Sequence, residues 1–377
     1  MYVIAHNGAR IWGGAERATA LVLKGLAERG HRVLLLCNDP LVRDRSMELG
    51  VPADLAVLGG DAALPDALRL AARLRRERPD ALVIGTWKKA WLAALAARLA
   101  GVPRVIARVG LDTDTPRSAK YRFVLGRWID AVVVNAAGMR PPFLERPGWT
   151  AERVTTIYNG VHLPPRSGED GAVRAALGIP AGVPVVGAVA RLASQKRFDR
   201  LLRVVAVLPA DVHCILAGDG EERESLERLA AELGVAGRVH FLGHRADTAD
   251  VLDAIDLFVV TSDREGMSNA MLEALATGVP VASTPVSGAD EALDALPDGR
   301  RPGVLTSFDA AEIASTVLSL LRDRTGLAKM ARAAKERAEA RFSFAAMIDG
   351  WEAVLEGAAG MRRAGTVTPA RGRGARS

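Results

Sequence analysis

Residues 262–284 read SDREGMSNAMLEALATGVPVAST and follow a short apolar run, LFVVT. A run of this length and β-branched content is typical of a buried parallel strand. Ser268 can cap a helix over about residues 269–277, because its hydroxyl can accept a hydrogen bond from a free amide of the first turn. Gly278 suits the left-handed position after such a helix, and Pro280 prevents its continuation. The stretch therefore predicts a strand, a loop, a helix and a second strand of an open α/β sheet, in which ligands bind at the carboxyl ends of strands.

Two carboxylates stand beside the start of this predicted helix. Free amides at a helix start favour a phosphate or another anion. Glu265 precedes that start and Glu273 lies on the second turn. Both acids would repel an anion unless they accept hydrogen bonds from neutral hydroxyl groups on either side of it. An anion flanked by hydroxyl groups describes a nucleotide sugar, and the alternative is a solvated loop acid with a surface helix glutamate.

Composition sets the outer limits of the prediction. The chain has 377 residues, of which 49% are hydrophobic and 25% are charged, so a globular protein with two cores is expected. Cys37 and Cys214 each lie in an apolar, strand-like run, which predicts buried thiols in a reducing compartment. The first residues, MYVIAHNG, lack the basic and apolar regions of a signal peptide, and the longest apolar helix candidate is too short to span a bilayer. These features predict a cytoplasmic protein, and no residue cluster has the spacing of a zinc site.

Short strand-like runs alternate with amphipathic helical patterns along the chain, as in parallel sheets. The first half contains YVIA, VLLLC, ALVIG, RVIAR, AVVVN and VTTIYNG, and then LPPRSGED breaks the pattern with two prolines. The alternation restarts with PVVGAVA, HCILAG, VHFLG, LFVVT, VPVAST and VLT. The predicted fold class is therefore α/β, with two doubly wound domains and a cleft between them. We place the first domain at residues 1–164 and the second at residues 165–341.

Net charge divides at the same boundary. Residues 1–165 carry 24 Lys and Arg against 15 Asp and Glu, whereas residues 166–361 carry 21 against 29. In the basic half, residues 69–78 (RLAARLRRER) and 117–128 (RSAKYRFVLGRW) mix cations with apolar side chains. These helices could lie on an anionic membrane or meet a phosphorylated lipid acceptor, and solvated helix faces are the alternative. No recognition module points to nucleic acid, and the basic tail at residues 362–377 is expected to be disordered.

Two further loops suit an anionic ligand. Gly13 and Gly14, in WGGAER after the first strand, would let the backbone approach a ligand closely at the start of a helix. The second loop lies in GAVARLASQKRFDRLL, where Arg191 and Lys196 could grip a diphosphate. Arg197, in the same loop, is expected to face solvent.

Six motifs in order between residues 13 and 283 resemble the retaining glycosyltransferases of family 4. The motifs are GGAER, YNGVH, ARLASQKRFDRLL, LAGDGEER, VHFLG and EGMSNAMLEALATGVPV. The resemblance implies the GT-B architecture: two Rossmann-like domains face each other across a cleft, and a C-terminal helix, here residues 342–360, crosses back to the first domain. It also implies transfer of a hexose from a nucleotide sugar to a hydroxyl of a glycan or lipid-linked acceptor, without a metal or other cofactor. We expect a UDP-hexose donor and a cell-envelope or exopolysaccharide acceptor.

The resemblance assigns roles to particular residues. Arg191 and Lys196 would hold the donor diphosphate, Glu265 would contact hydroxyls of the transferred sugar, and Glu273 would contact the ribose. The first three would be the catalytic residues, through stabilisation of the leaving group while the acceptor hydroxyl attacks the same face of the sugar. The donor pocket would also include the backbone of Gly13, Gly14, Gly266, Met267, Ser268 and Asn269.

The chain departs from the family pattern on the acceptor side. Many members carry a His in the loop after the fourth strand of the first domain, whereas residues 106–112 here read IARVGLD. Arg108 or Asp112 could occupy that place, His6 in the first loop is another candidate, and His162 replaces the usual Asp after YNGV.

Two other functions stay open on the same architecture. One is a different enzyme, such as a nucleotide-sugar epimerase or a phosphorylase. The other is a scaffold that binds sugar nucleotides without turnover, against which the intact cations and glutamates argue. The donor base, the hexose, the acceptor and the oligomeric state are not determined by the sequence.

Overall fold

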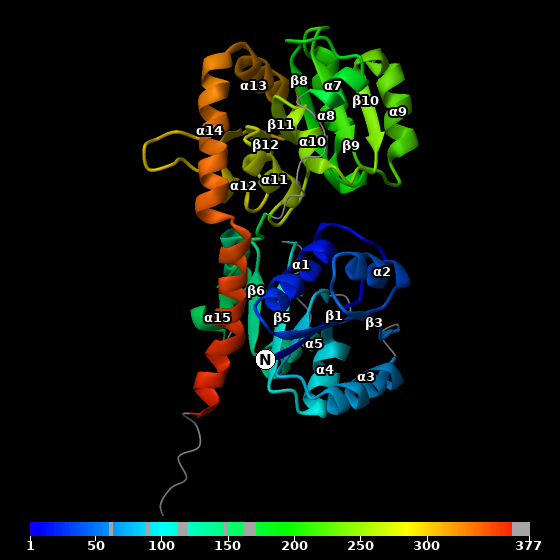
Figure 1. The fold of residues 1–377 in the computed structure, drawn as a ribbon, viewed down its shortest axis with the longest axis vertical. Helices are drawn as coiled ribbons and strands as arrows, with labels where there is room; N and C mark the ends of the chain where they lie inside the picture. The colour runs from blue at the N-terminus through cyan, green and yellow to red at the C-terminus, as the bar shows by residue number, and fades with distance from the viewer. Residues whose placement is uncertain (60–62, 88–89, 112–118, 146–148, 162–170, 364–377) are drawn as a thin grey trace, which may run out of the picture.

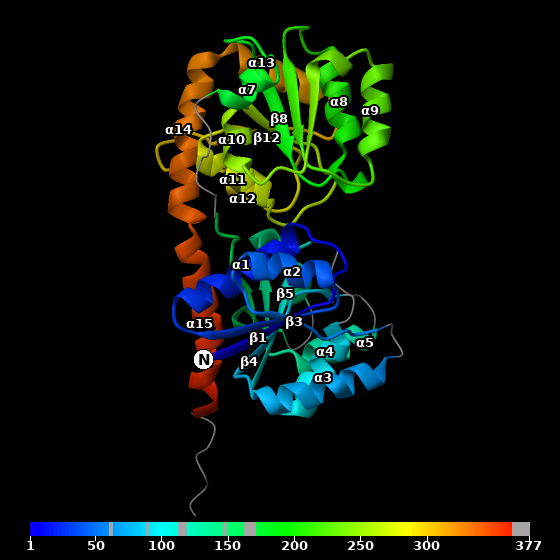
Figure 2. The same cartoon turned by 45° about the vertical axis from the view of Figure 1, so that its right-hand side comes forward.

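The computed structural model describes residues 1–59, 63–87, 90–111, 119–145, 149–161 and 171–363. Within these residues the chain forms two parallel sheets, one in each of two domains stacked end to end, and helices cover both faces of each sheet (Figures 1 and 2). The predicted α/β class with two doubly wound domains is confirmed. The predicted boundary near residue 165 lies outside the described residues.

The first domain is built on a seven-stranded sheet in the order β3-β2-β1-β4-β5-β6-β7. The strands are β1 (Tyr2–Asn7), β2 (Arg32–Cys37), β3 (Ala53–Leu55), β4 (Ala81–Ile84), β5 (Arg104–Val109), β6 (Ala131–Val134) and β7 (Val154–Thr156). The helices are α1 (Gly14–Glu28), α2 (Pro40–Glu48), α3 (Leu64–Glu77), α4 (Ala90–Ala100), α5 (Ala119–Trp128) and α6 (Pro141–Leu144), with short turns η3 (Ala137–Met139) and η4 (Ala151–Arg153). The central strands are buried on both faces, which explains their unbroken apolar sequences.

The second domain is built on a six-stranded sheet in the order β10-β9-β8-β11-β12-β13. The strands are β8 (Val185–Val189), β9 (His213–Ala217), β10 (Val239–Gly243), β11 (Leu257–Val260), β12 (Val281–Ser283) and β13 (Gly303–Leu305). The helices are α7 (Ala172–Ala176), α8 (Phe198–Val207), α9 (Arg223–Glu232), α10 (Thr248–Asp253), α11 (Asn269–Thr277), α12 (Ala289–Leu293), α13 (Ala310–Arg322) and α14 (Arg324–Arg341), with turns η5 (Ser194–Lys196) and η6 (Ala236–Arg238).

The unit predicted from residues 262–284 is confirmed in detail. Helix α11 begins after Ser268, whose Oγ accepts a hydrogen bond from the Met271 amide at 3.4 Å. The helix ends at Gly278, which has a φ of 84° in the left-handed region that favours glycine. Strand β12 follows after Pro280. Three small elements of the first domain, α2, α6 and β3, were not predicted, because none has a long apolar run and β3 is only half-buried.

The last helix crosses back to the first domain, as predicted. Helix α15 (Phe344–Arg363) packs against α1 (Figure 1), and its Trp351 is 2% exposed in the core beneath the first sheet. An ideal Cβ on Gly25 would lie 2.3 Å from Ile348 Cδ1, so the glycine permits this close helix contact. Beside the start of α15, the Val161 amide donates to the Phe342 carbonyl at 2.9 Å, which joins the two places where the chain passes between the domains.

Cys37 and Cys214 are free and buried, as expected, and burial raises the pKa of each thiol to about 12. No described helix is long and apolar enough to cross a bilayer. Within the described ranges, no group of three or more His, Cys, Asp or Glu side chains is arranged to hold a metal ion.

Candidate active site

The carboxyl ends of the two sheets lie at the junction of the domains (Figure 2). The strand order reverses between β1 and β4 in the first sheet and between β8 and β11 in the second. Loops that leave neighbouring strands in opposite directions at such a point form a crevice that commonly binds a ligand. The loops after β1, β8 and β11 carry the predicted site residues, so the fold brings three separate sequence motifs to one cleft.

Lys196 and Glu265 form an ion pair in the second domain. Lys196 ends the η5 turn after β8, and Glu265 lies in the loop after β11. Ser262 also donates its hydroxyl to Glu265 Oε1 at 2.8 Å. The Glu265 side chain is only 10% exposed, so its charge is compensated by one cation and one hydroxyl in a nearly buried place.

Hydrogen bonds fasten these two loops to each other. Thr261 donates its hydroxyl to the Lys196 carbonyl at 3.1 Å, and the Gln195 side chain donates to the Arg264 carbonyl at 2.6 Å. The Asp263 amide donates in turn to the Gln195 carbonyl at 3.1 Å. Both loops are therefore held in register, which positions the lysine and the glutamate without help from the first domain.

The two arginines of the β8 loop have different environments. Arg191 lies at the rim of the cleft, where its side chain is 43% exposed and its Nη1 is 3.4 Å from Glu221 Oε2. Arg197 was expected to face solvent, but the structure shows that it does so only in part. It is half-buried, and its guanidinium bonds to Asp199 and Asp263, which sustain its left-handed φ of 54°. The same guanidinium lowers the pKa of the Asp199 carboxyl.

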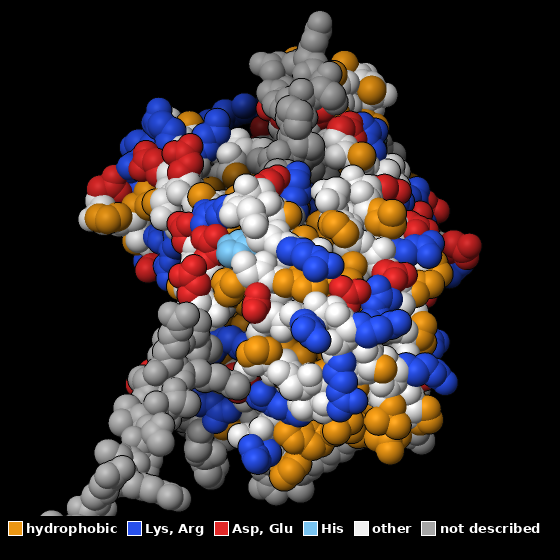
Figure 3. Space-filling view, turned by 60° about the horizontal axis from the view of Figure 1, so that its bottom comes forward, with side chains coloured by type: hydrophobic (Ala, Val, Ile, Leu, Met, Phe, Trp, Pro, Cys, Tyr) orange, Lys and Arg blue, Asp and Glu red, His pale blue; other side chains and the backbone are white. Residues whose placement is uncertain are grey.

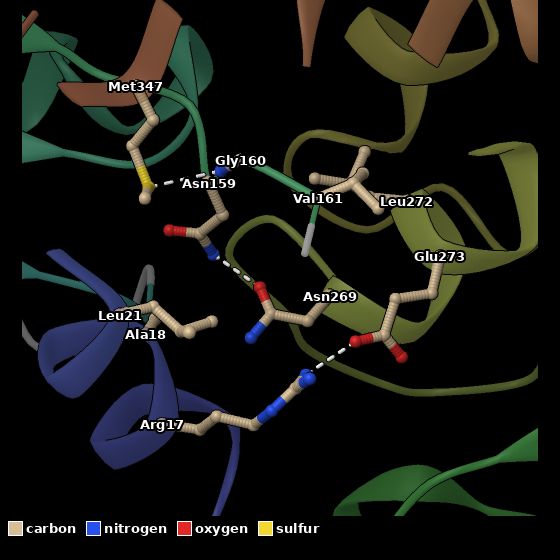
Figure 4. A pocket seen from close by; sticks show the side chains of 10 residues that line it. All are labelled: Arg17, Ala18, Leu21, Asn159, Gly160, Val161, Asn269, Leu272, Glu273 and Met347. Atoms are coloured by element: carbon tan, nitrogen blue, oxygen red, sulfur yellow. Dashed lines mark hydrogen bonds and ion pairs between the residues drawn. The ribbon is translucent and has the colours of Figure 1, made fainter. Parts of the chain in front are cut away.

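Glu273 meets a partner from the opposite domain. Arg17 of α1 places its Nη1 2.5 Å from Glu273 Oε1 at the edge of a crevice between α1, α11 and α15 (Figure 4). The Glu273 side chain is 8% exposed and that of Arg17 is 29% exposed. The crevice has room for about one water molecule. A ring-sized ligand group would therefore fit there only if the domains separated or the Arg17 side chain moved.

A chain of hydrogen bonds crosses the cleft beside this pair (Figure 4). Arg108 Nη2 donates to Asn159 Oδ1 at 3.0 Å, and Asn159 Nδ2 donates to Asn269 Oδ1 at 2.7 Å. Asn269 Nδ2 then donates to the Gly14 carbonyl at 3.1 Å. Arg108 is 4% exposed, and its burial lowers its pKa to about 10. The chain brings together Gly14 and Asn269, which the sequence assigned to opposite walls of one donor pocket.

The backbones of the two domains approach each other closely at Gly266. An ideal Cβ on this residue would lie 2.2 Å from the Gly110 carbonyl oxygen and 2.6 Å from Asn135 Oδ1. Asn135 is 3% exposed, and its Oδ1 has no hydrogen-bond partner among the described residues. Only glycine permits this approach, because any side chain at Gly266 would collide with the first domain.

Comparison with known proteins identifies the family. Residues 12–163 match the family model described as Glycosyltransferase Family 4, and residues 183–323 match the model described as Glycosyl transferases group 1. The lipopolysaccharide core biosynthesis glycosyltransferase LpsE of Rhizobium meliloti (strain 1021) is 32% identical over 348 residues, which cover 91% of this chain and 96% of that protein. The chain belongs to glycosyltransferase family 4. The resemblance inferred from the motifs is therefore confirmed.

Solved structures share the fold of this glycosyltransferase. The Anabaena HepE protein in complex with UDP-glucose matches with a TM-score of 0.82 at 23% identity, over 95% of this chain and 100% of that chain. Sucrose-phosphate synthase from Thermosynechococcus elongatus matches with a TM-score of 0.76 at 20% identity, over 97% of this chain and 99% of that chain. At these identities the matches establish the two-domain GT-B fold alone.

The acceptor-side candidates of the glycosyltransferase lie in different surroundings, and some lie outside the described residues. His6 is buried, and its Nε2 lies 3.1 Å from the Ala56 carbonyl oxygen, which gives it a structural contact inside the first domain. Arg108 lies beside the cleft and supports the hydrogen-bond chain across it. Asp112 and His162 lie outside the described residues. A role in acceptor binding stays a prediction for His6, Arg108 and Asp112.

Sequence analysis missed several polar residues that the glycosyltransferase brings to the cleft. One of them, Glu16, is 7% exposed; burial raises the pKa of its carboxyl, and the charges of Arg108 and Arg191 oppose that shift. Glu16 lies within the quoted GGAER motif, but its burial has no signal in the sequence. The other missed residues are Arg17, Asn135, Asn159 and Glu291.

Proposed function

We propose that this glycosyltransferase moves a hexose from a UDP-hexose to a hydroxyl of a glycan or lipid-linked acceptor, with retention of the anomeric configuration. The observation that carries the proposal is the Lys196–Glu265 pair, which lies at the reversal of the second sheet and beside the start of α11. The LpsE relative, named for lipopolysaccharide core biosynthesis, and the HepE structure with UDP-glucose support the choice of acceptor class and donor base.

Lys196 and Glu265 suit the two parts of such a donor, the diphosphate and the hexose. When a diphosphate enters, the Lys196 ammonium can turn to its oxygens, and Arg191 can reach in from the rim because its side chain is exposed. Glu265 is then free to accept hydrogen bonds from hydroxyls of the hexose. The amides at the start of α11 add a positive end beside the phosphates. Glu273 accepts hydrogen bonds from the ribose hydroxyls once its ion pair with Arg17 has broken.

The chemistry we propose needs no metal and no protein nucleophile. The bond between the anomeric carbon and the diphosphate oxygen breaks, and the acceptor oxygen bonds to the same face of the sugar. The acceptor proton passes to an oxygen of the departing diphosphate. Lys196 and Arg191 stabilise the negative charge that develops on that group, so most of the acceleration comes from electrostatics and positioning.

Binding of the nucleotide is the first test. We expect UDP to raise the melting temperature of the protein more than GDP or ADP does, because a ligand that binds only the folded state stabilises it. We expect Glu273→Gln to reduce this shift, because an amide replaces one acceptor oxygen for the ribose hydroxyls. A larger shift with GDP or ADP would contradict the choice of UDP.

Product analysis then separates the candidate reactions. With UDP-hexoses, EDTA and a glycan acceptor, we expect release of UDP and a glycoside that keeps the donor anomeric configuration by NMR. Formation of an epimeric nucleotide sugar would support the epimerase alternative, and an inverted glycoside would contradict retention. Loss of transfer in EDTA that added Mg²⁺ restores would contradict the metal-independent reaction.

We also propose that the first domain binds peripherally to the inner, cytoplasmic face of an anionic membrane. Helices α3, α4 and α5 expose large apolar side chains there, and Figure 3 shows basic and apolar side chains mixed over the end of the molecule that faces the viewer. A surface of this kind can insert apolar groups at the lipid boundary while its cations meet the headgroups. The exposed residues are Leu64, Leu68, Leu99, Phe123, Arg69, Arg75, Arg76 and Arg127.

Vesicle flotation tests this contact. We expect the protein to float with phosphatidylglycerol vesicles but not with phosphatidylcholine vesicles. The double variant Arg69→Glu with Arg76→Glu should bind the anionic vesicles at least about tenfold more weakly, since each surface cation contributes roughly 1 kcal/mol. Arg228→Glu with Arg332→Glu is the matched control, because it makes the same charge change on exposed residues of the second domain. Equal loss in both double variants would contradict a specific face.

A further inference from the structure

Glu291 joins the two domains at a point outside the proposed donor pocket. It lies on α12 in the second domain, and its carboxylate oxygens accept hydrogen bonds from the backbone amides of Ala137 and Gly138 at 3.0 and 3.1 Å. These amides belong to η3 of the first domain. Each carboxylate oxygen accepts one hydrogen bond from a backbone amide, so the contact is bidentate. Both hydrogen bonds are charge-assisted, and such hydrogen bonds are stronger than neutral ones.

The same carboxylate contacts the segments where the chain passes between the domains. Tyr158 donates its hydroxyl to Glu291 Oε2 at 2.6 Å, and Arg341 donates to the Tyr158 oxygen at 2.7 Å. Arg341 also donates to the Glu291 carbonyl at 3.3 Å. Tyr158 lies just before the first crossing and Arg341 just before the second. One side chain therefore fixes both the first domain and the hinge relative to α12.

Helix α12 and turn η3 each adjoin one wall of the proposed sugar pocket. An ideal Cβ on Gly288, just before α12, would lie 3.1 Å from the Gly266 carbonyl oxygen and 2.9 Å from Met267 Cε. Turn η3 begins two residues after Asn135, whose Oδ1 lies against Gly266. A movement of Glu291 relative to η3 would therefore separate the Gly266 loop from the Asn135 wall.

We propose that Glu291 is a positioning residue that latches the closed cleft around the reacting sugar. The inference rests on the proposed function, because it takes the pocket at Gly266 to hold the transferred hexose. The latch is reversible, since water can replace each of its hydrogen bonds when the domains part. The α15 contact is different, because Trp351 is buried in an apolar core and keeps the helix on the first domain.

Distance measurement tests the latch without any turnover. Spin labels on Met47→Cys in α2 and Val207→Cys in α8 report the separation of the domains, because both positions are exposed and both native cysteines are buried. With UDP bound, we expect a short, narrow distance distribution in the otherwise native protein. Glu291→Gln should give a longer and broader one, because its amide group would face a backbone N–H that needs an acceptor. Tyr158→Phe removes the hydrogen bonds of the hydroxyl with Glu291 and Arg341 but leaves the two amide contacts of Glu291, so its distance distribution should fall between them.

Kinetics test the consequence for transfer. We expect Glu291→Gln to lower kcat by about 10- to 100-fold through misplacement of the two substrates, with little change in the KM for the donor. The donor-binding residues other than the Gly13–Gly14 loop lie in the second domain, so their contacts survive opening. Glu339→Gln is the matched control, since this exposed glutamate on α14 makes the same chemical change away from the cleft.

The outcomes are separable. An unchanged label distance in Glu291→Gln overturns the latch, whatever the activity. A longer distance with a kcat equal to that of Glu339→Gln overturns the positioning role. If the native protein transfers no sugar, the proposed function fails, and the label distances still decide whether Glu291 holds the domains together.

Discussion

We expect Lys196→Ala to lower kcat by about 10²- to 10³-fold, the usual effect of removing one group that stabilises a developing negative charge. Lys196 is paired with Glu265 and lies where the donor diphosphate would depart. Glu265→Ala should have an effect of similar size, because the hexose hydroxyls lose their acceptor. Neither side chain belongs to a sheet or to an apolar core, so both variants should remain folded, which circular dichroism checks.

Two further variants make the test of Lys196 specific. Lys196→Arg keeps the charge with a different shape, and we expect it to recover part of the lost kcat. Lys329→Ala removes an exposed cation of the same domain and should leave kcat unchanged. Near-native transfer by Lys196→Ala or by Glu265→Ala would exclude the corresponding residue from the catalytic set.

The second large effect is expected for Gly266→Ala. The added methyl group would lie 2.2 Å from the Gly110 carbonyl oxygen, so the domains could not close as they do in the native protein. The backbone of Gly266 is outside the left-handed region, and alanine can therefore adopt it without strain. We expect kcat to fall about 100-fold, as for other misplacements of about 1 Å, while UDP still raises the melting temperature.

Gly237→Ala is the matched control for this substitution. An ideal Cβ on Gly237 has no atom within 4 Å, and its φ is likewise outside the left-handed region. The control should transfer sugar at the native rate. A native kcat in Gly266→Ala would mean that the close approach to Gly110 is not part of the reactive arrangement, and loss of UDP binding would mean that the substitution disturbs the donor loop itself.

Much of the fold could be predicted because its signals are local. The apolar, β-branched runs mark strands that are buried on both faces, and the Ser268 cap and the Gly278 terminus set the limits of α11. Helix α2 and strand β3 escaped prediction because both are short and partly exposed, so their sequences resemble loops. The C-terminal helix was placed on the first domain by resemblance, and no local pattern states which surface it covers.

The sequence by itself determined that Lys196 and Glu265 lie in two loops at one edge of the second sheet. Lys196 and Glu265 each follow a predicted strand, and parallel strands bring such loops to one edge of a sheet. Only the tertiary structure decided the contacts across the cleft: Arg17 with Glu273, Asn159 with Asn269, Glu291 with η3, and Gly266 against Gly110. These partners are more than 100 residues apart in the chain and belong to different domains. Their pairing depends on how two folded surfaces fit together, and no local sequence pattern specifies that fit.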